Sequence, residues 1–376
     1  MNVASDIMNK VGENVVASVN SVLPKGSVKK HVISLMIFAV LMIFILAWIY
    51  NTTTLNKANC DRIELVTEMD GKLTSNIDKN HNALRDYYVK TAYNACASGQ
   101  FKNDFMNICA LENAIKQGAR CLDFQIYSLD DEPVVAAASV NDFNIKETYN
   151  SVKFSEALTL INDIAFSTEC PNTYDPIILH LRIRSKNRKM YEKLANLIVK
   201  ILSKKLLSPA YNYKRNENNL GNTILSELKQ KVVIIVDESN KFFETTSLVE
   251  IINQTSHSST MFLTKYTDVQ YAPDVESLII ENRNNMRMVI PELSASSTNN
   301  DALIALDYGC QFVAMSFQNL DNNMKNYNDY FRTGGYSFLL KEKNLLSVEQ
   351  SATSQSQSSY VYTPKTVTKD FYSFII

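Results

Sequence analysis

The most apolar stretch of the chain is VISLMIFAVLMIFILAWIY, residues Val32–Tyr50, which contains no charged side chain. As a helix rising about 1.5 Å per residue it reaches about 28 Å, close to the ~30 Å hydrocarbon core of a bilayer. A core helix would show a polar face, and a cleaved signal peptide would end in small residues rather than in Trp48, Ile49 and Tyr50. The pattern therefore predicts a single uncleaved transmembrane helix over residues 31–50.

Beyond residue 80, short β-branched and aromatic runs alternate with stretches of helical periodicity. Near-continuous apolar runs are typical of parallel strands that are buried on both faces. Repeated strand–helix units predict an α/β fold, either a closed (β/α)8 barrel or an open doubly wound sheet, and periodicity alone does not choose between them. The predicted strands are Cys121–Tyr127, Pro176–Ile183, Lys231–Val236, Met286–Ile290, Cys310–Phe317 and Tyr336–Leu340, with Val134–Ala138 as a further candidate, and the predicted helices include Phe154–Ala165 and Lys189–Lys205.

Polar segments divide the rest of the chain. Residues 51–82 are predicted to form a stalk between the membrane and a folded domain over residues 83–346. Residues 347–376 are predicted to be a Ser/Gln-rich flexible tail with an apolar end. Residues 1–30 form a short basic tail, and its cluster of Lys25, Lys29 and Lys30 predicts a cytosolic N-terminus. The folded domain is then expected on the lumenal or external side.

Composition narrows the possible partners. The 376 residues carry 38 Lys+Arg against 39 Asp+Glu, a net charge of −1, which argues against a nucleic-acid partner. The expected partner is the membrane, through the single span. Of six Cys residues none lies in a CxxC motif or a Cys/His cluster, so no metal site is predicted from them. Cys96 and Cys109 are the predicted disulfide, and Cys121 and Cys310 are expected to be small buried side chains within strands.

Two segments resemble the phosphatidylinositol-specific phospholipase C family. The first, Leu111–Ile183, contains LENAIKQGARCLDFQIYSLDDEPVV followed by DPIILHLRI. The second, Tyr308–Leu345, contains GCQFVAMSFQ followed by GGYSFLLK. The resemblance spans roughly residues 83–345 and implies a TIM-type (β/α)8 barrel of the phospholipase C-like phosphodiesterase kind, preceded by one transmembrane helix.

The resemblance also implies a chemistry that this chain lacks the groups to perform. Family members use one imidazole as a general base on the inositol 2-hydroxyl and another as a general acid. Tyr93 stands at the first His position, within Thr91–Ala95, and Ala137 stands at the second, after Pro133. A phenol with a pKa of about 10 is a poor base at pH 7, and alanine transfers no proton. No catalytic residue is therefore expected at these two degenerate positions.

In that family an Asn and several carboxylates hold Ca²⁺, which prefers oxygen ligands. The resemblance places Asn94 at the Asn position and Asp123 at one carboxylate position. Gln125 and Arg182 stand where two further carboxylates belong. We therefore predict that the Ca²⁺ site is lost, that no cofactor is bound, and that the Arg182 guanidinium pairs with Asp123 or Asp237.

The substrate-binding positions of the family are also altered. Ile235 and Asp237 stand where the resemblance places two phosphate-binding lysines. Met288 and Ile290 lie in the segment that matches the family's "Arg-Ile-Tyr-Pro". Arg287 is one residue out of register, and a slip of one residue on a strand turns a side chain to the other face.

Three functions follow from these observations. The first is a membrane-anchored phospholipase C-like pseudoenzyme that acts as a scaffold or interaction module. The second is a divergent phosphoric diester hydrolase acting on phosphoinositide-type lipids, with Tyr93, His180 and Asp123 as its working groups. The third, based on the short basic tail and the Asn/Lys/Ser-rich ectodomain, is a structural membrane protein of a large DNA virus particle. Because His180 lies two residues from Arg182 on a strand, it is expected to be a hydrogen-bonded interior histidine.

Overall fold

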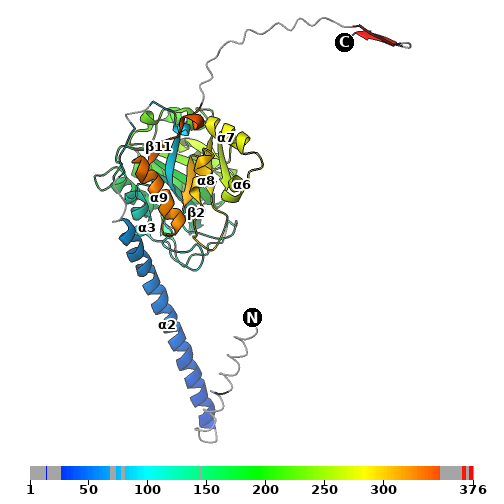
Figure 1. Cartoon of the computed structure of the whole chain (residues 1–376). Helices are drawn as coiled ribbons and strands as arrows, with labels where there is room; N and C mark the ends of the chain where they lie inside the picture. Colours follow the sequence, from blue (N-terminus) through cyan, green and yellow to red (C-terminus); the bar gives the residue numbers. More distant parts are fainter. Residues whose placement is uncertain are drawn as a thin grey trace.

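A computed structural model describes Asn14 and residues 27–67, 73–77, 81–143, 145–347, 366–369 and 372–375. Helix α2 (Ser27–Thr67) is one continuous helix that projects from the globular part beside α3 (Ile108–Lys116) (Figure 1). It contains the apolar segment predicted from the sequence. Among the described residues it is the one helix long and apolar enough to cross a membrane.

The globular part is a near-closed barrel of eight parallel strands. The hydrogen-bonded order is β7-β6-β5-β2-β1-β10-β9-β8, and the end strands β7 and β8 are joined by the short segment 257–260. The predicted TIM-type barrel is thereby confirmed, and the open sheet is excluded. The barrel strands are β1 (Tyr87–Ala92), β2 (Cys121–Leu129), β5 (Ile177–Arg184), β6 (Val232–Asp237), β7 (Gln254–Ser256), β8 (Met261–Lys265), β9 (Met286–Ile290) and β10 (Phe312–Met315).

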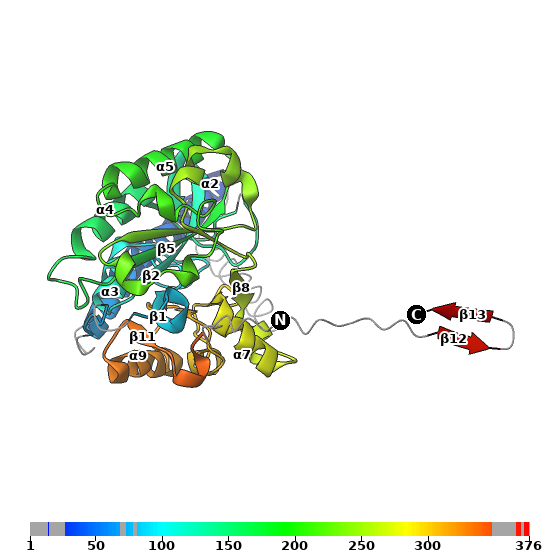
Figure 2. The same cartoon turned by 90° about the horizontal axis from the view of Figure 1, so that it is seen from above.

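Helices surround the barrel, as the view from above shows (Figure 2). Besides α3 they are α4 (Phe154–Ile164), α5 (Arg188–Leu202), α6 (Tyr266–Gln270), α7 (Val275–Asn284), α8 (Ala302–Asp307) and α9 (Asn322–Gly334). The 3-10 helices are Leu84–Asp86, Pro209–Tyr211, Leu220–Asn222, Leu225–Leu228, Lys241–Thr245, Ser247–Ile251 and Lys343–Leu345. The remaining strands are β3 (Glu132–Val135), β4 (Val152–Lys153), β11 (Phe338–Leu340) and the hairpin β12 (Thr366–Lys369) with β13 (Tyr372–Ile375).

All seven predicted strands are present, with ends that shift by a few residues. Sequence analysis did not delimit β1 and did not predict β7 or β8. Strand β7 reads Gln-Thr-Ser, and its three residues are buried although they are polar. Such a short polar strand has no alternation of apolar and polar residues, so the sequence gives no signal for it. Its side chains are satisfied by partners elsewhere in the barrel. The Ser/Gln-rich segment of the predicted tail, residues 348–365, lies outside the described residues.

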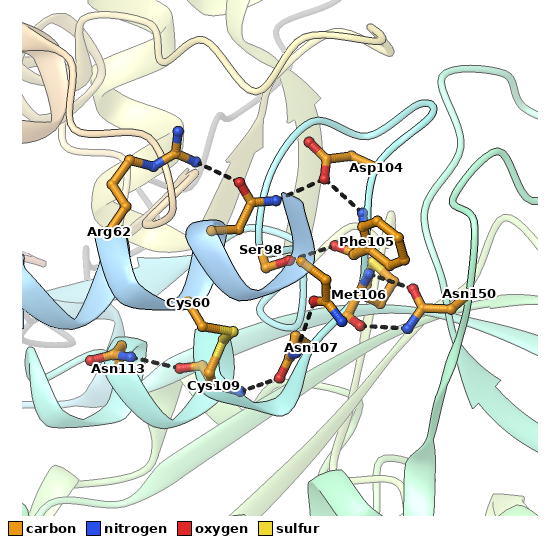
Figure 3. Close-up of a disulfide and its surroundings, with 12 residues drawn as sticks. Cys60, Arg62, Ser98, Asp104, Phe105, Met106, Asn107, Cys109, Asn113 and Asn150 are labelled. Atoms are coloured by element: carbon orange, nitrogen blue, oxygen red, sulfur yellow. Dashed lines mark hydrogen bonds between the residues drawn. A yellow bond between two sulfur atoms is a disulfide. The ribbon is translucent and has the colours of Figure 1, made fainter. Parts of the chain in front are cut away.

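Residues 51–67, in the segment predicted as a stalk, continue α2 and are fastened to the barrel. Cys60 forms a disulfide with Cys109 at the start of α3, so the predicted Cys96–Cys109 pairing is wrong (Figure 3). Cys96 is a free, fully buried thiol in the core. Farther along the predicted stalk, Leu73 and Ile77 are also buried in the barrel core. The expectation of small buried side chains at Cys121 and Cys310 is confirmed, although Cys310 precedes β10 instead of lying within it.

A buried polar cluster closes the barrel at the amino-terminal end of β2. Arg120 is fully buried and donates to the carbonyl oxygens of Ala165 (2.8 Å) and Asn172 (2.6 Å). Asp175 lies nearby and accepts a hydrogen bond from the Ser75 hydroxyl, while its second carboxyl oxygen has no partner among the described residues. Burial raises the pKa of Asp175 to about 6, against the opposing charge of Arg120. This carboxyl group therefore makes the folded state sensitive to pH.

Asp175→Asn is expected to be more stable than the wild type at pH 7. Between about pH 4 and pH 6 folded Asp175 keeps a proton that the unfolded chain has released, so the free energy of unfolding falls as pH rises. The decrease in the free energy of unfolding is complete above pH 6 and amounts to at most about 3 kcal/mol. Urea unfolding of both proteins from pH 4 to pH 7 measures the difference. A difference that does not change across this range would contradict the prediction.

Candidate functional site

The polar residues inside the barrel come from facing positions on neighbouring strands. In the parallel pairing of β2 with β5, Asp123 lies opposite His180 and Gln125 lies opposite Arg182. Because side chains alternate along a strand, these four residues share the interior face. All four are at most 1% exposed. The site is therefore an internal cluster of polar groups.

The centre of the cluster is a two-point ion pair. Arg182 Nε donates to Asp123 Oδ1 at 2.8 Å, and Nη2 donates to Asp123 Oδ2 at 2.5 Å. The predicted pairing of Arg182 with Asp123 is confirmed. Asp237, the other predicted partner, instead accepts hydrogen bonds from the backbone and hydroxyl of Ser239. A parallel pair of charge-assisted hydrogen bonds is the strongest arrangement that these two groups offer.

The turn after β1 adds the next two groups. Asn94 has φ of 43°, in the left-handed region that Asn tolerates better than most residues. Its backbone N–H donates to Asp123 Oδ2 at 3.1 Å, and its side-chain oxygen accepts from Arg182 Nη2 at 2.9 Å. The guanidinium carbon of Arg182 lies 4.7 Å from the centre of the Tyr93 ring. Arg182 is thus surrounded by a carboxylate, an amide oxygen and an aromatic face.

On the other side of Asp123, a histidine continues the hydrogen-bonded chain. His180 Nδ1 lies 2.7 Å from Asp123 Oδ1, and Nε2 lies 2.8 Å from Ser256 Oγ. The expectation of an interior histidine is confirmed. Sequence analysis missed Ser256, because it lies on β7. Ser256, His180 and Asp123 have the order of a hydrolase triad, but each is fully buried, so no substrate reaches the hydroxyl.

Burial and charge act on this cluster in opposite directions. Burial by itself would raise the pKa of Asp123, but the Arg182 charge and the hydrogen bonds from His180 and Arg182 hold that pKa well below its usual range. Burial opposes the charge of Arg182, yet Asp123 keeps the pKa of the guanidinium above its ordinary value. Burial also raises the pKa of the Tyr93 phenol, even though Arg182 acts against it. The cluster thus holds a fixed ion pair and a neutral phenol.

The other predicted site positions lie on barrel strands, except Ala137, which follows β3. Ala137, Ile235 and Met288 are fully buried. Gln125 is engaged as well, since its side-chain oxygen accepts from the Tyr127 hydroxyl at 3.1 Å and from a backbone N–H at 3.2 Å. Ile290 lines a cavity of about 10 Å³, which has room for about one water molecule. An inositol phosphate does not fit a space of this size.

The side chains do not fit a Ca²⁺ ion at the position that the resemblance indicates. The two oxygen donors that remain there, on Asn94 and Asp123, are both bound by the guanidinium of Arg182. That guanidinium stands where a third oxygen ligand would be required, and it repels a divalent cation. In the described part of the chain, no group of three or more His, Cys, Asp or Glu residues could hold a metal ion.

The near-closed barrel of parallel strands, with polar groups on inward-facing positions, places this chain in the class of (β/α)8 proteins. Residues 80–238 match the family model of the phosphatidylinositol-specific phospholipase C X domain, and residues 229–344 match that of the Y domain. Together the two matches cover the whole barrel. The chain therefore belongs to the phosphatidylinositol-specific phospholipase C-like phosphodiesterase family.

Solved structures agree with this assignment at the level of the fold. The crystal structure of PLC21 from S. officinalis superimposes with a TM-score of 0.59 at 18% identity, over 73% of this chain and 39% of that one. PLC21 from L. pealei gives a TM-score of 0.58 at 18% identity, over 72% of this chain and 38% of that one. The chain thus spans well under half the length of these two proteins. No curated protein matches it by sequence.

Proposed function

We propose that this chain is a single-pass, membrane-anchored phospholipase C-like barrel that no longer hydrolyses phosphodiesters and serves as a scaffold or interaction module. The observation that carries the proposal is the position of Arg182. Its guanidinium binds both oxygen groups, on Asp123 and Asn94, that the resemblance assigns to Ca²⁺. A permanent positive charge in that position replaces the metal and gives the buried carboxylate its counter-ion.

The proton-transfer positions support the same proposal. Tyr93 is 2% exposed, and its raised pKa keeps the phenol protonated at neutral pH. Ala137 has no titratable group. General acid–base catalysis requires groups whose pKa lies near the working pH and that reach the substrate. Neither position meets these requirements.

A divergent phosphoric diester hydrolase is the second candidate, because the structure brings its three working groups together. Tyr93 contacts Arg182, which binds Asp123, which in turn lies next to His180. These contacts use the same polar atoms that catalysis would need. All of the side chains are buried, so the second candidate also requires the barrel to open before a lipid headgroup could enter.

The location in the cell is part of the proposal. Helix α2 supplies the membrane span, and the basic residues before it favour a cytosolic N-terminus. The disulfide between Cys60 and Cys109 supports a barrel in an oxidising compartment, on the lumenal or external side. A disulfide is the expected form of this cysteine pair there, and it would be rare in the cytosol.

The full-length chain, reconstituted in vesicles that contain phosphatidylinositol, is expected to release no inositol phosphate, with Ca²⁺ or with a chelator. An active phospholipase C added to the same vesicles serves as the positive control. Tyr93→Phe is the matched variant, because it removes only the hydroxyl and keeps the ring that contacts Arg182. Turnover by the wild type that is lost in Tyr93→Phe would support the hydrolase instead. Turnover that a chelator abolishes would contradict the loss of the Ca²⁺ site.

A further inference from the structure

The end of the barrel at which the strands begin carries a cavity of about 490 Å³, a volume typical of small-molecule sites. It is lined by the end of α4 and the residues after it, by Lys204 and Lys205 after α5, and by residues 229–231 before β6. Helices α4 and α5 pack side by side on the outside of the barrel (Figure 2). The cavity therefore lies at the opposite end from the carboxyl ends of the strands, where barrels of this class hold their catalytic groups.

Positive charge is concentrated in the lining of this cavity. The lining contains four lysines, namely Lys204, Lys205, Lys229 and Lys231. Among the described residues that line it, Asp163 is the one carboxylate, and its Oδ1 accepts a hydrogen bond from the Asn162 amide at 3.2 Å. Because the whole chain has a net charge of −1, the cluster does not follow from a basic composition. A cleft lined by one sign of charge raises the local concentration of ligands of the opposite sign.

Backbone hydrogen bonds hold two of the four lysines in place. The Val232 N–H donates to the carbonyl oxygen of Lys205 at 2.7 Å, and Leu206 forms a parallel bridge with Val232. The carbonyl oxygen of Lys231 accepts from the N–H of Ile177, the first residue of β5, at 2.9 Å. Lys205 and Lys231 are thus attached to the starts of two barrel strands, so their backbones need no ordering when a ligand binds.

The ammonium groups keep donors available for a ligand. Lys205 Nζ donates to the carbonyl oxygen of Asn162 at 2.5 Å, and Lys231 Nζ donates to another backbone carbonyl oxygen at 3.4 Å. An ammonium group has three N–H donors, and these contacts use one on each lysine. Within the described residues, Lys204, Lys205 and Lys231 form no ion pair with a carboxylate. Burial lowers the pKa of Lys205, against the charge of Asp163, and a bound anion would favour the charged form.

The lining indicates which class of anion fits. Lysine is a compact point charge that binds phosphate oxygens without a fixed geometry, whereas the arginine fork matches planar carboxylates. Of the described residues that line the cavity, none is an arginine. Four cations against one carboxylate call for a ligand with several negative charges. A cavity of limited volume favours a small ligand over an extended polyanion.

We propose that this cavity binds a small, soluble, polyvalent anion of the phosphate class. The inference goes beyond the proposed function and holds whether or not the barrel hydrolyses phosphodiesters. Phosphate groups on lipids are the other source of the same chemistry. Helix α2 is joined through Cys60 to Cys109 at the start of α3, on the side where the strands end. Lipids around its apolar segment would therefore lie at the other end of the barrel.

The test is isothermal titration calorimetry of the full-length chain in phosphatidylcholine nanodiscs, with inorganic tripolyphosphate as the probe. Lys204→Gln/Lys231→Gln is the cavity variant, because Lys204 is exposed and Lys231 makes one long hydrogen bond, so that the fold does not depend on either ammonium group. Lys265→Gln/Lys325→Gln is the matched control, which removes the same charge from two exposed lysines outside the cavity lining. Urea unfolding checks that the three proteins are equally stable.

The wild type and the control are expected to bind tripolyphosphate with dissociation constants within about twofold of each other. The cavity variant should bind about tenfold more weakly or worse, because each lost ammonium group removes a charge-assisted contact. Absence of binding by the wild type, or equal binding by the wild type and the cavity variant, would overturn the site.

Two further titrations test the ligand class and its source. A hexaglutamate peptide that binds more tightly than tripolyphosphate would overturn the assignment to phosphate. Phosphatidylcholine vesicles that contain phosphatidic acid provide the lipid-borne phosphate. Binding of these vesicles through the cavity lysines, without binding of tripolyphosphate, would overturn the assignment to a soluble anion.

Discussion

Replacing Arg182 by methionine is expected to lower the free energy of unfolding by about 3–5 kcal/mol. The side chain is 1% exposed and supplies two hydrogen bonds to Asp123, which is fully buried. Without it, a carboxylate remains inside the barrel with only His180 and one backbone N–H as partners. A buried charge that has lost its counter-ion is among the most destabilising changes a single substitution makes. Chemical denaturation of both proteins measures the effect.

Arg184→Met is the matched control for this experiment. Arg184 lies on the same strand and the same face, but its guanidinium donates to Asn141 in an exposed contact. Arg184→Met should lower the free energy of unfolding by less than about 1 kcal/mol. A second control combines Arg182→Met with Asp123→Asn, which removes both charges and should recover part of the loss. The ion pair would be unimportant if Arg182→Met and Arg184→Met unfolded at the same denaturant concentration.

Removing the disulfide is expected to lower the free energy of unfolding by roughly 4 kcal/mol, as chain entropy predicts for a bond across 49 positions of sequence. The double variant Cys60→Ser/Cys109→Ser should unfold at a lower denaturant concentration than the oxidised wild type. A reductant should lower the stability of the wild type and leave the double variant unchanged. An equal response of both proteins to the reductant would show that the bond does not form.

The pairing itself is readable by mass spectrometry after trypsin digestion without reduction. Cleavage after Lys57 and Arg62 releases a peptide that contains Cys60, and cleavage after Lys102 and Lys116 releases one that contains Cys109. These two peptides are expected as a cross-linked pair. Cys96 lies on the preceding tryptic peptide and should remain a free thiol. A link between the Cys96 and Cys109 peptides would overturn the structure at this point.

Much of the candidate site was predictable from strand periodicity and from motif positions. Arg182 and Asp123 lie on runs that are apolar apart from a few residues, and an uncompensated charge in such a run requires a partner of opposite sign. The spacing of His180 and Arg182 placed both side chains on one face. Ser256 was not predictable, because its strand is three polar residues long and its role depends on its register with β6.

The disulfide is a second feature that could not be predicted from the sequence. Cys96 and Cys109 are near in sequence, but a disulfide requires Cα atoms within about 7 Å and side chains that face each other. Cys60 and Cys109 meet these requirements, with Cα atoms 5.9 Å apart, because α2 continues past its apolar segment and packs beside α3.

By itself, the sequence determined an apolar segment long enough to cross a membrane, the alternation of strands and helices and, through its family motifs, the barrel class. These properties depend on local composition, on periodicity and on short motifs, all of which can be read along the chain. Only the tertiary structure decided which cysteine pairs with Cys60, that Arg182 binds Asn94 as well as Asp123, and that Tyr149 meets Trp48. Each of these contacts joins segments that are far apart in sequence, and their distances depend on how the whole chain packs.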